Sequence, residues 1–253
     1  MSHLEELTLY IHIYDGPTFI SGTYLDNEIL IHLPRLHTFT FYFASENTVV
    51  GPVIQLSNMD IERTFADERY RHVGCMVDYF VSCRKICYRV FSLPFKFDRL
   101  EYVTHNIPNI MFDAVIYLKL WDDEPFKHEF FVRLARSFPF LKSLSISNIT
   151  PPYFTIHEYR LRDKDWCSTV EYPHLISLNI RKAHYHYIEH FLNETKTYLP
   201  RLTQLKICYN NLKTVTNNFT RDETRSNCAN VKRLIAERCI VYPKEVYDYF
   251  PLL

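Results

Sequence analysis

The amino-acid sequence predicts an α/β fold, a curved solenoid with short parallel β-strands on its concave side and helices outside. Three observations predict it. One pattern of apolar residues recurs eight times. Amphipathic segments connect several of the recurrences. One long interval between recurrences contains two adjacent β-rich runs. Together they indicate a repeat array with an inserted β-hairpin.

The recurring pattern is apolar-x-x-apolar-x-apolar, and its last member is weak in two frames. In "LPRLTQLKICYN" (199–210) it falls on Leu202, Leu205 and Ile207. Its end has period two, which is typical of a strand that points alternate side chains into a core. Its beginning has period three and follows a proline, which is typical of the turn that ends a helix. The eight frames are Leu4/Leu7/Leu9, Leu36/Phe39/Phe41, Leu100/Val103/His105, Val115/Leu118/Leu120, Leu141/Leu144/Ile146, Leu175/Leu178/Ile180, Leu202/Leu205/Ile207 and Val231/Leu234/Ala236.

The spacing of these frames indicates a leucine-rich repeat. Their first residues lie 32, 64, 15, 26, 34, 27 and 29 positions apart, and most of these intervals are near the 20–29 residues of that repeat. Parallel strands need crossover connections, so we expect each connection to return as an outer helix. The sequence therefore predicts a single leucine-rich-repeat-like domain over 1–253.

Three segments are predicted to be helices. In 124–138, phenylalanine and leucine recur at steps of four, and 184–199 places apolar residues on one flank. The segment 242–250 is predicted to close the chain as a helix, with Pro243 in its first turn. The acidic run 122–124 lies between a predicted strand and a predicted helix, and we interpret it as a cap of that helix.

Two intervals depart from the repeat. An insert over 45–96 contains two alternating β-rich runs, which predict a hairpin at about 72–91. The interval from Leu100 to Val115 is too short for a crossover helix. We expect an extended or single-turn link there, containing Pro108.

Composition excludes several function classes. Hydrophobic residues make up 47% and charged residues 23%, which is typical of a globular protein. Lys+Arg and Asp+Glu both total 29, so no net charge favours nucleic acid or anionic lipid as a partner. No run of 18 apolar residues predicts a membrane span. The chain has no signal peptide and seven cysteines, so we expect reduced thiols and a cytoplasmic or nuclear location.

Two groups of residues could hold a metal ion. His72, Cys75, Cys83 and Cys87 lie within sixteen positions, but their spacing is not that of paired zinc knuckles. We interpret Cys75 and Cys87 as small residues that alternate in a strand, and we expect no metal there. The second group is His184, His186 and His190, which we interpret as solvated histidines on a helix surface.

No nucleophile elbow, P-loop, dinucleotide fingerprint or kinase motif is present in the sequence. We therefore expect no enzymatic activity and no cofactor. A metal-dependent enzyme built around the histidines or the hairpin cysteines is the alternative from another function class.

The concave face is the predicted binding surface. Residues between the inward anchors of a strand point outward, and tyrosine and tryptophan are favoured at protein interfaces. The preference of β-strands for threonine and tyrosine is the competing explanation. The predicted protein-binding residues are Tyr10, Tyr42, Tyr102, Tyr117, Lys119, Trp121, Asn179, Arg181 and Lys206.

Several segments carry a family resemblance. "LPRLHTFTFYF", "SLPFKFDRLEYV", "PFKHEFFVRLARSFPFLKSL", "VEYPHLISLNI", "FLNETKTYLPRLTQLKI" and "FTRDETRSNCANVKRLI" resemble the C-terminal leucine-rich region of a large group of F-box proteins. In that group an N-terminal F-box docks on the adaptor of a cullin-type ubiquitin ligase, and the repeat region captures the protein to be ubiquitinated. The resemblance implies a protein target for this chain. It implies adaptor binding only if an F-box is supplied upstream, because no F-box helices appear in the sequence.

A stand-alone leucine-rich-repeat scaffold, unrelated to ubiquitination, is the alternative binding function. We also expect the chain to be a fragment whose first frame, Leu4/Leu7/Leu9, leaves its leading edge unprotected. Weak self-association through that frame is the expected result.

Overall fold

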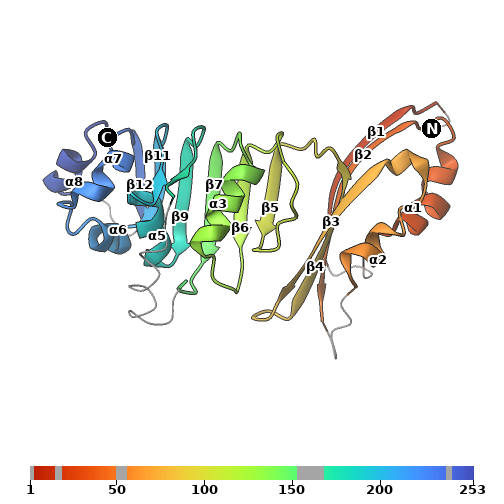
Figure 1. Cartoon of the computed structure of the whole chain (residues 1–253), viewed down its shortest axis with the longest axis horizontal. Coiled ribbons are helices and arrows are strands. Elements are labelled where there is room, and N and C mark those ends of the chain that lie inside the picture. Colours follow the sequence, from red (N-terminus) through yellow and green to blue (C-terminus); the bar gives the residue numbers. More distant parts are fainter. Residues whose placement is uncertain (1–2, 15–18, 50–55, 153–167, 238–240) are drawn as a thin grey trace. The chain divides into compact units, whose positions relative to one another are not determined.

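The computed structural model describes residues 3–14, 19–49, 56–152, 168–237 and 241–253 (Figure 1). The chain divides into two compact units. Unit 1 is Met1–Lys96 with Asn106–Pro108, and unit 2 is Phe97–His105 with Asn109–Leu253. Each unit is described separately, and the single domain over 1–253 stays a prediction.

Unit 2 contains a six-stranded sheet in which every strand is parallel to its neighbours. The strand order is β12-β11-β9-β7-β6-β5. This sheet confirms an α/β fold with stacked parallel strands for the last six frames. The strands are β5 (Arg99–Val103), β6 (Tyr117–Trp121), β7 (Ser143–Asn148), β9 (Ser177–Ala183), β11 (Gln204–Cys208) and β12 (Arg233–Glu237).

The register of this sheet aligns the leucines of successive frames. Leu118, Leu144, Leu178 and Leu205 are consecutive Cα partners across four strands, and all four are fully buried. Such a ladder continues the core from strand to strand, because each repeat buries its apolar face against the next. The predicted inward face of these frames is therefore confirmed.

Helices connect β6 to β7, β9 to β11 and β11 to β12. Of these, α3 and α5 contribute buried aromatic and aliphatic side chains to the core of unit 2. The predicted helix 184–199 ends earlier than expected, at Leu192. The Asn193 carboxamide oxygen accepts hydrogen bonds from the backbone N–H and the hydroxyl of Thr195, and this local turn stops the helix. Unit 2 contains α3 (His128–Ser137), α5 (Tyr185–Leu192), α6 (Tyr209–Val215), η3 (Asp222–Thr224), α7 (Arg225–Cys228), α8 (Lys244–Tyr249) and the short parallel pair β8 (Val170–Glu171) and β10 (Thr197–Tyr198).

The interpretation of the acidic run 122–124 as a helix cap is wrong. Helix α3 begins at His128, and its N-cap residue Lys127 makes no side-chain cap hydrogen bond. Asp122 is buried and accepts hydrogen bonds from the backbone N–H groups of Glu124 and His105. Its carboxylate therefore joins the ends of two neighbouring strands.

The third frame begins three residues earlier than predicted. Leu100 pairs with Leu118, the second member of the next frame, so Leu100 is itself a second member. Val103 then pairs with Leu120 across a register shift, at which Tyr102 adopts a φ of 56°. This β-bulge inserts one extra residue into β5, which hides the period-two pattern in the sequence. The link that follows has no helix, as predicted.

Unit 1 contains a mixed sheet of order β1-β2-β4-β3. The predicted hairpin is confirmed as antiparallel β3 and β4, and β4 is also antiparallel to β2. β1 and β2, from the first two frames, are parallel. The elements are β1 (Glu6–Tyr14), α1 (Gly22–Glu28), η1 (Leu30–His32), β2 (Thr38–Thr48), α2 (Asn58–Glu62), η2 (Glu68–Tyr70), β3 (His72–Phe80) and β4 (Lys85–Leu93).

The prediction that one parallel sheet uses all eight frames is wrong. β2 has only two edges for backbone pairing, and β1 and β4 occupy both. No edge of β2 is therefore left for the strand of the third frame. The hairpin completes the sheet of the first two frames instead of packing on the flank of a continuous array.

Two cysteines of the hairpin, Cys75 and Cys87, lie on opposite faces of this sheet. Cys75 belongs to the cluster that includes Phe39, Phe41 and Tyr70, whereas Cys87, which pairs with Asp78, alternates with the cluster residues of β4. Among the described residues no group of three or more His, Cys, Asp or Glu side chains is placed to hold a metal ion. None of the described helices is long and apolar enough to cross a membrane.

The reactivity of the thiols follows from how far each cysteine is buried. The described cysteines are free thiols, and only Cys83, in the hairpin turn, is exposed. Burial raises the pKa of Cys75 to about 12, so its reactive thiolate is scarce at neutral pH. We expect Cys83→Ser to remove one fast-reacting thiol in a native DTNB assay. Cys228→Ser is the matched control, because that buried thiol should count only after unfolding. Equal native counts for Cys83→Ser and wild type would contradict the exposed turn.

Candidate protein-binding face

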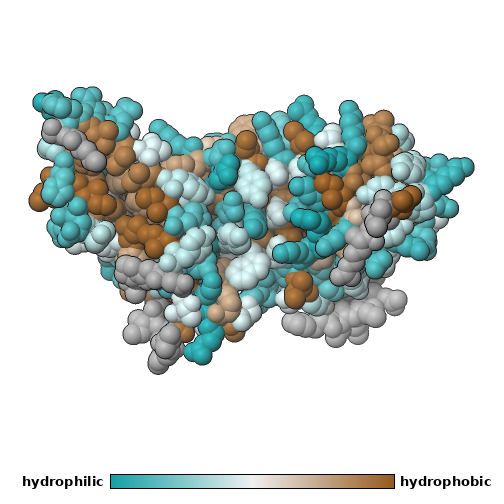
Figure 2. Space-filling view, turned by 180° about the vertical axis from the view of Figure 1, so that it is seen from behind, coloured by the Kyte–Doolittle hydropathy of each residue, from teal (hydrophilic) through white to brown (hydrophobic). Residues whose placement is uncertain are grey.

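The face of the unit 2 sheet opposite the frame leucines is polar. We call this surface the open face, and Figure 2 shows it from the side away from α3, mostly in the teal and white of polar and intermediate residues. Most of its side chains are half-buried or exposed, and along each strand they alternate with the buried residues of the frames. Its residues are Tyr102, Tyr117, Lys119, Trp121, Ser143, Ser145, Ser147, Ser177, Asn179, Arg181, Lys182, Gln204, Lys206, Cys208, Arg233, Ile235 and Glu237.

Strand register arranges these side chains in rows across the sheet. One row runs from Lys119 through Ser145 and Asn179 to Lys206. The outward side chains of β7 are all serine, so short hydroxyl groups separate the larger side chains of β6 from those of β9. The row therefore aligns two cations, an amide and a hydroxyl across four strands.

Lys119 lies against Tyr102, a contact that the bulge in β5 makes possible. Its Nζ atom is 4.1 Å from the centre of the Tyr102 ring. Partial burial opposes the charge of Lys119, but a hydrogen bond to Tyr102 and the nearby Glu101 carboxylate raise its pKa overall. Lys119 therefore stays protonated at neutral pH while its ammonium group is held beside an aromatic ring.

A second bulge adds a cation that the sequence analysis missed. In β9 the register moves from Ser145–Asn179 to Ser147–Lys182, which places Lys182 in the outward row. Arg181 stays on the same face, because its backbone N–H and Nε both lie about 3.5 Å from the Asn179 carboxamide oxygen. The signal in the sequence was the step of three between the buried Ile180 and Ala183.

Seven of the nine predicted binding residues lie on the open face, and two do not. Tyr42 belongs to unit 1 and is fully buried, so its prediction as a surface residue is wrong. Tyr10 also belongs to unit 1 and stacks on Tyr42, with 4.6 Å between ring centroids. The residues brought together are Tyr102, Tyr117, Lys119, Trp121, Asn179, Arg181 and Lys206.

The cations of the open face have no ion-pair partner within 4.0 Å among the described residues. They are Lys119, Arg181, Lys182, Lys206 and Arg233. The acidic side chains on or beside this face are Glu101 and Glu237. Positive charge therefore exceeds negative charge here, in a chain whose formal net charge is zero.

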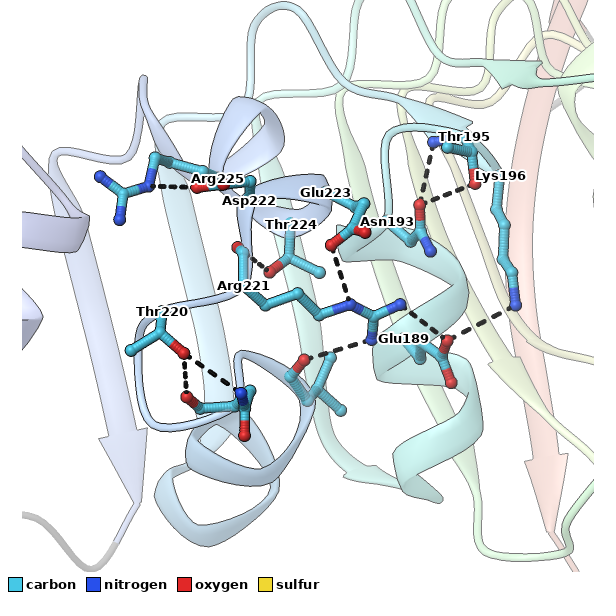
Figure 3. Close-up of polar contacts among 12 residues, drawn as sticks. Glu189, Asn193, Thr195, Lys196, Thr220, Arg221, Asp222, Glu223, Thr224 and Arg225 are labelled. Carbon is cyan, nitrogen blue, oxygen red and sulfur yellow. Dashed lines mark hydrogen bonds and ion pairs between the residues drawn. The ribbon is translucent and has the colours of Figure 1, made fainter.

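Two cations on the helix side of unit 2, Arg221 and Lys196, are paired with carboxylates (Figure 3). The Arg221 guanidinium lies 3.3 Å from the Glu189 carboxylate and 3.4 Å from that of Glu223. Lys196 is 3.6 Å from the same Glu189 carboxylate. These pairs neutralise charge within the fold.

The histidines of 184–190 are not a set of solvated surface residues. His190 is buried, with its ring centroid 5.4 Å from that of His128 and 4.7 Å from that of Phe131. Burial lowers the pKa of His190 well below its usual value, so the imidazole is neutral at physiological pH. His184 instead caps α5, by accepting a hydrogen bond from the His186 N–H.

His105 and Asp122 form a pair that sequence reasoning did not identify. The His105 Nδ1 atom lies 2.6 Å from the Asp122 carboxylate. The Arg133 guanidinium donates a hydrogen bond to the His105 carbonyl oxygen. His105 follows β5 and Asp122 follows β6, which are neighbouring strands. Their contact therefore links the C-terminal ends of these two strands.

Comparisons with known proteins add no relative: no family model, no curated protein and no solved structure matches this chain.

Proposed function

We propose that this chain is a protein-interaction module whose open face binds its partner. The observation that supports this most directly is that five cations of the open face form no ion pair within 4.0 Å among the described residues. Tyr102, Tyr117 and Trp121 supply aromatic surface beside them, and aromatic residues are enriched at protein interfaces.

The partner of this face is an acidic polypeptide segment in extended conformation. Its carboxylates complement Lys119, Lys206 and Arg181, and its backbone can hydrogen-bond to the serine hydroxyls of β7. Nucleic acid is disfavoured, because the chain has a sequence pI of about 7.2 and no net charge to attract a polyanion over distance.

The resemblance to F-box proteins supports a more specific role. In that role the open face recognises the protein to be ubiquitinated, in the cytoplasm or nucleus, and an F-box supplied upstream would dock on the ligase adaptor. A stand-alone repeat scaffold would use the same face without ubiquitin transfer. A ubiquitination assay with an F-box fused upstream separates the two roles, since only the first yields a modified partner.

The binding proposal is tested by reversing charge on the open face. We expect Lys119→Glu/Lys206→Glu to weaken the binding of a fluorescein-labelled Glu/Ser peptide by roughly tenfold or more, equivalent to about 1.4 kcal/mol. Fluorescence anisotropy at low and high salt measures it, because screening should weaken wild-type binding.

The matched control is Lys213→Glu, an exposed lysine of α6. It reverses a charge on a helix outside the proposed interface, where the ligand is attracted only over a screened distance, so the affinity should stay within about twofold. Equal losses for the two variants would show that net charge alone governs binding. Tighter binding of single-stranded RNA than of the acidic peptide would favour a nucleic-acid partner and contradict the proposal.

A further inference from the structure

The outer edge of β12 is occupied by a side chain of the same molecule. β12 is the last strand in the order of the unit 2 sheet, and β11 is its one neighbour among the described strands. The Tyr242 hydroxyl donates a hydrogen bond of 3.0 Å to the Leu234 carbonyl oxygen and accepts one of 3.2 Å from the Ala236 N–H. Tyr242 immediately precedes Pro243, the N-cap residue of α8. The segment that follows β12 therefore returns to cover its edge.

These two hydrogen bonds are the ones that a further parallel strand would make. The Arg233 N–H donates to the Thr203 carbonyl oxygen, so Arg233 and Ile235 direct their backbone groups toward β11, and the residues between them direct theirs outward. In a parallel ladder, one residue of the next strand donates to the carbonyl group before Ile235 and accepts from the N–H group after it. The Tyr242 hydroxyl can both donate and accept, and it makes the same two bonds. It thus takes the place of one residue of an additional strand.

The sequence of β12, RLIAE, is complementary to itself in antiparallel orientation. With Ile235 opposite Ile235 of a second copy, Arg233 faces Glu237 and Leu234 faces Ala236, and each pair occurs twice because of the two-fold symmetry. Arg233 and Glu237 are exposed whereas Leu234 and Ala236 are buried, so each pair joins side chains of the same kind of environment. Opposite charges and apolar pairs across strands stabilise pairing. An uncovered β12 would therefore be a template for a second β12.

We propose that Tyr242 closes the sheet of unit 2 and prevents β12 from pairing with β12 of a second copy. Covering an edge strand is one way in which proteins oppose edge-to-edge association, and a repeat array needs such a cap at its end. The occupant of the uncovered edge is the same strand of another copy, antiparallel and two-fold symmetric about Ile235. The tests below leave Lys119 and Lys206 unchanged, so this proposal and the binding function of the open face fail independently.

Amide hydrogen exchange, measured by NMR, tests the cap. Tyr242→Phe keeps the ring and removes the hydroxyl, so the Ala236 amide should exchange about tenfold faster or more than in wild type. The Ile235 amide, which points toward β11, should keep its rate and thereby show that the sheet is intact. Tyr247→Phe is the matched control, because it removes the hydroxyl of an exposed tyrosine of α8 and should leave both rates unchanged. An unchanged Ala236 rate in Tyr242→Phe would overturn the cap.

Cysteine cross-linking tests the partner and its register. Ile235 would be a non-hydrogen-bonded position at the two-fold axis, where cross-strand Cβ atoms are about 4.5–5.5 Å apart, near disulfide geometry. In a Tyr242→Ala background, which removes the ring from the edge, Ile235→Cys should give a disulfide-linked dimer under mild oxidation. Ile235→Cys with Tyr242 intact should not, and neither should Arg233→Cys/Tyr242→Ala, because residue 233 faces Glu237. Tyr242→Ala oxidised in parallel controls for the native cysteines. Equal amounts of Ile235→Cys dimer with and without Tyr242 would overturn the proposal.

Charge exchange tests the pairing without a disulfide. In sedimentation velocity, Tyr242→Ala should form a dimer whose dissociation constant is about tenfold or more below that of wild type, because the edge is uncovered. Adding Glu237→Arg places arginine opposite arginine and should raise that constant about fivefold or more. Adding Arg233→Glu as well exchanges the charges and should restore most of the loss. Tyr247→Ala is the matched control and should behave as wild type. A monomeric Tyr242→Ala, or a charge-exchanged variant as weak as the one with Glu237→Arg alone, would overturn the second copy as the occupant.

Discussion

Alanine at Leu178 or at Leu205 is expected to reduce the free energy of unfolding by about 2–5 kcal/mol. Both leucines are fully buried and are Cα partners in adjacent strands of unit 2. Each substitution removes buried methyl groups and leaves a cavity that the neighbouring strands cannot fill without moving. Urea unfolding followed by circular dichroism measures the effect as a lower midpoint.

The matched controls lie one residue away in the same strands. Ser177 and Gln204 are also Cα partners, but they lie on the open face and are joined by a hydrogen bond of 3.2 Å. Ser177→Ala and Gln204→Ala should each change the free energy of unfolding by about 0.5 kcal/mol or less, as surface substitutions do. Equal midpoint shifts for leucine and control variants would mean that the two faces of the sheet had been exchanged.

Arg89→Met should cost about 3–5 kcal/mol, because it leaves a buried carboxylate without its counter-charge. Arg89 and Asp78 are each 1% exposed, and the guanidinium donates a hydrogen bond to the Asp78 carboxylate. The Asn106 amide also donates to that carboxylate, at 3.3 Å. A neutral donor such as this amide cannot replace the charge of Arg89 in a site shielded from water.

A double-mutant cycle separates the pair from its surroundings. Arg89→Met/Asp78→Leu should lose less stability than Arg89→Met alone, because apolar residues can replace a buried ion pair at little cost. The control is Arg63→Met, which breaks an exposed pair with Asp60 and should change stability very little. If Arg89→Met cost no more than Arg63→Met, the buried pair would not matter to folding.

The candidate site was predictable where the strand pattern is regular. Tyr117, Lys119 and Trp121 alternate with buried leucines in β6, so their shared face follows from period two alone. The bulges of β5 and β9 break that period. They moved Tyr102 beside Lys119 and added Lys182 to the face, because an extra residue changes the side to which later side chains point.

Local patterns in the sequence by themselves determined the strands of the six-stranded sheet, the hairpin and the main helices, because each depends on side-chain periodicity within one short segment. Tertiary structure decided how the strands share edges. β4 occupies the second edge of β2, so the first two frames form a sheet separate from the other six. It also decided the burial of Tyr42 and His190. Both residues resemble surface positions in their own segments, and only packing from residues distant in the sequence removes them from water.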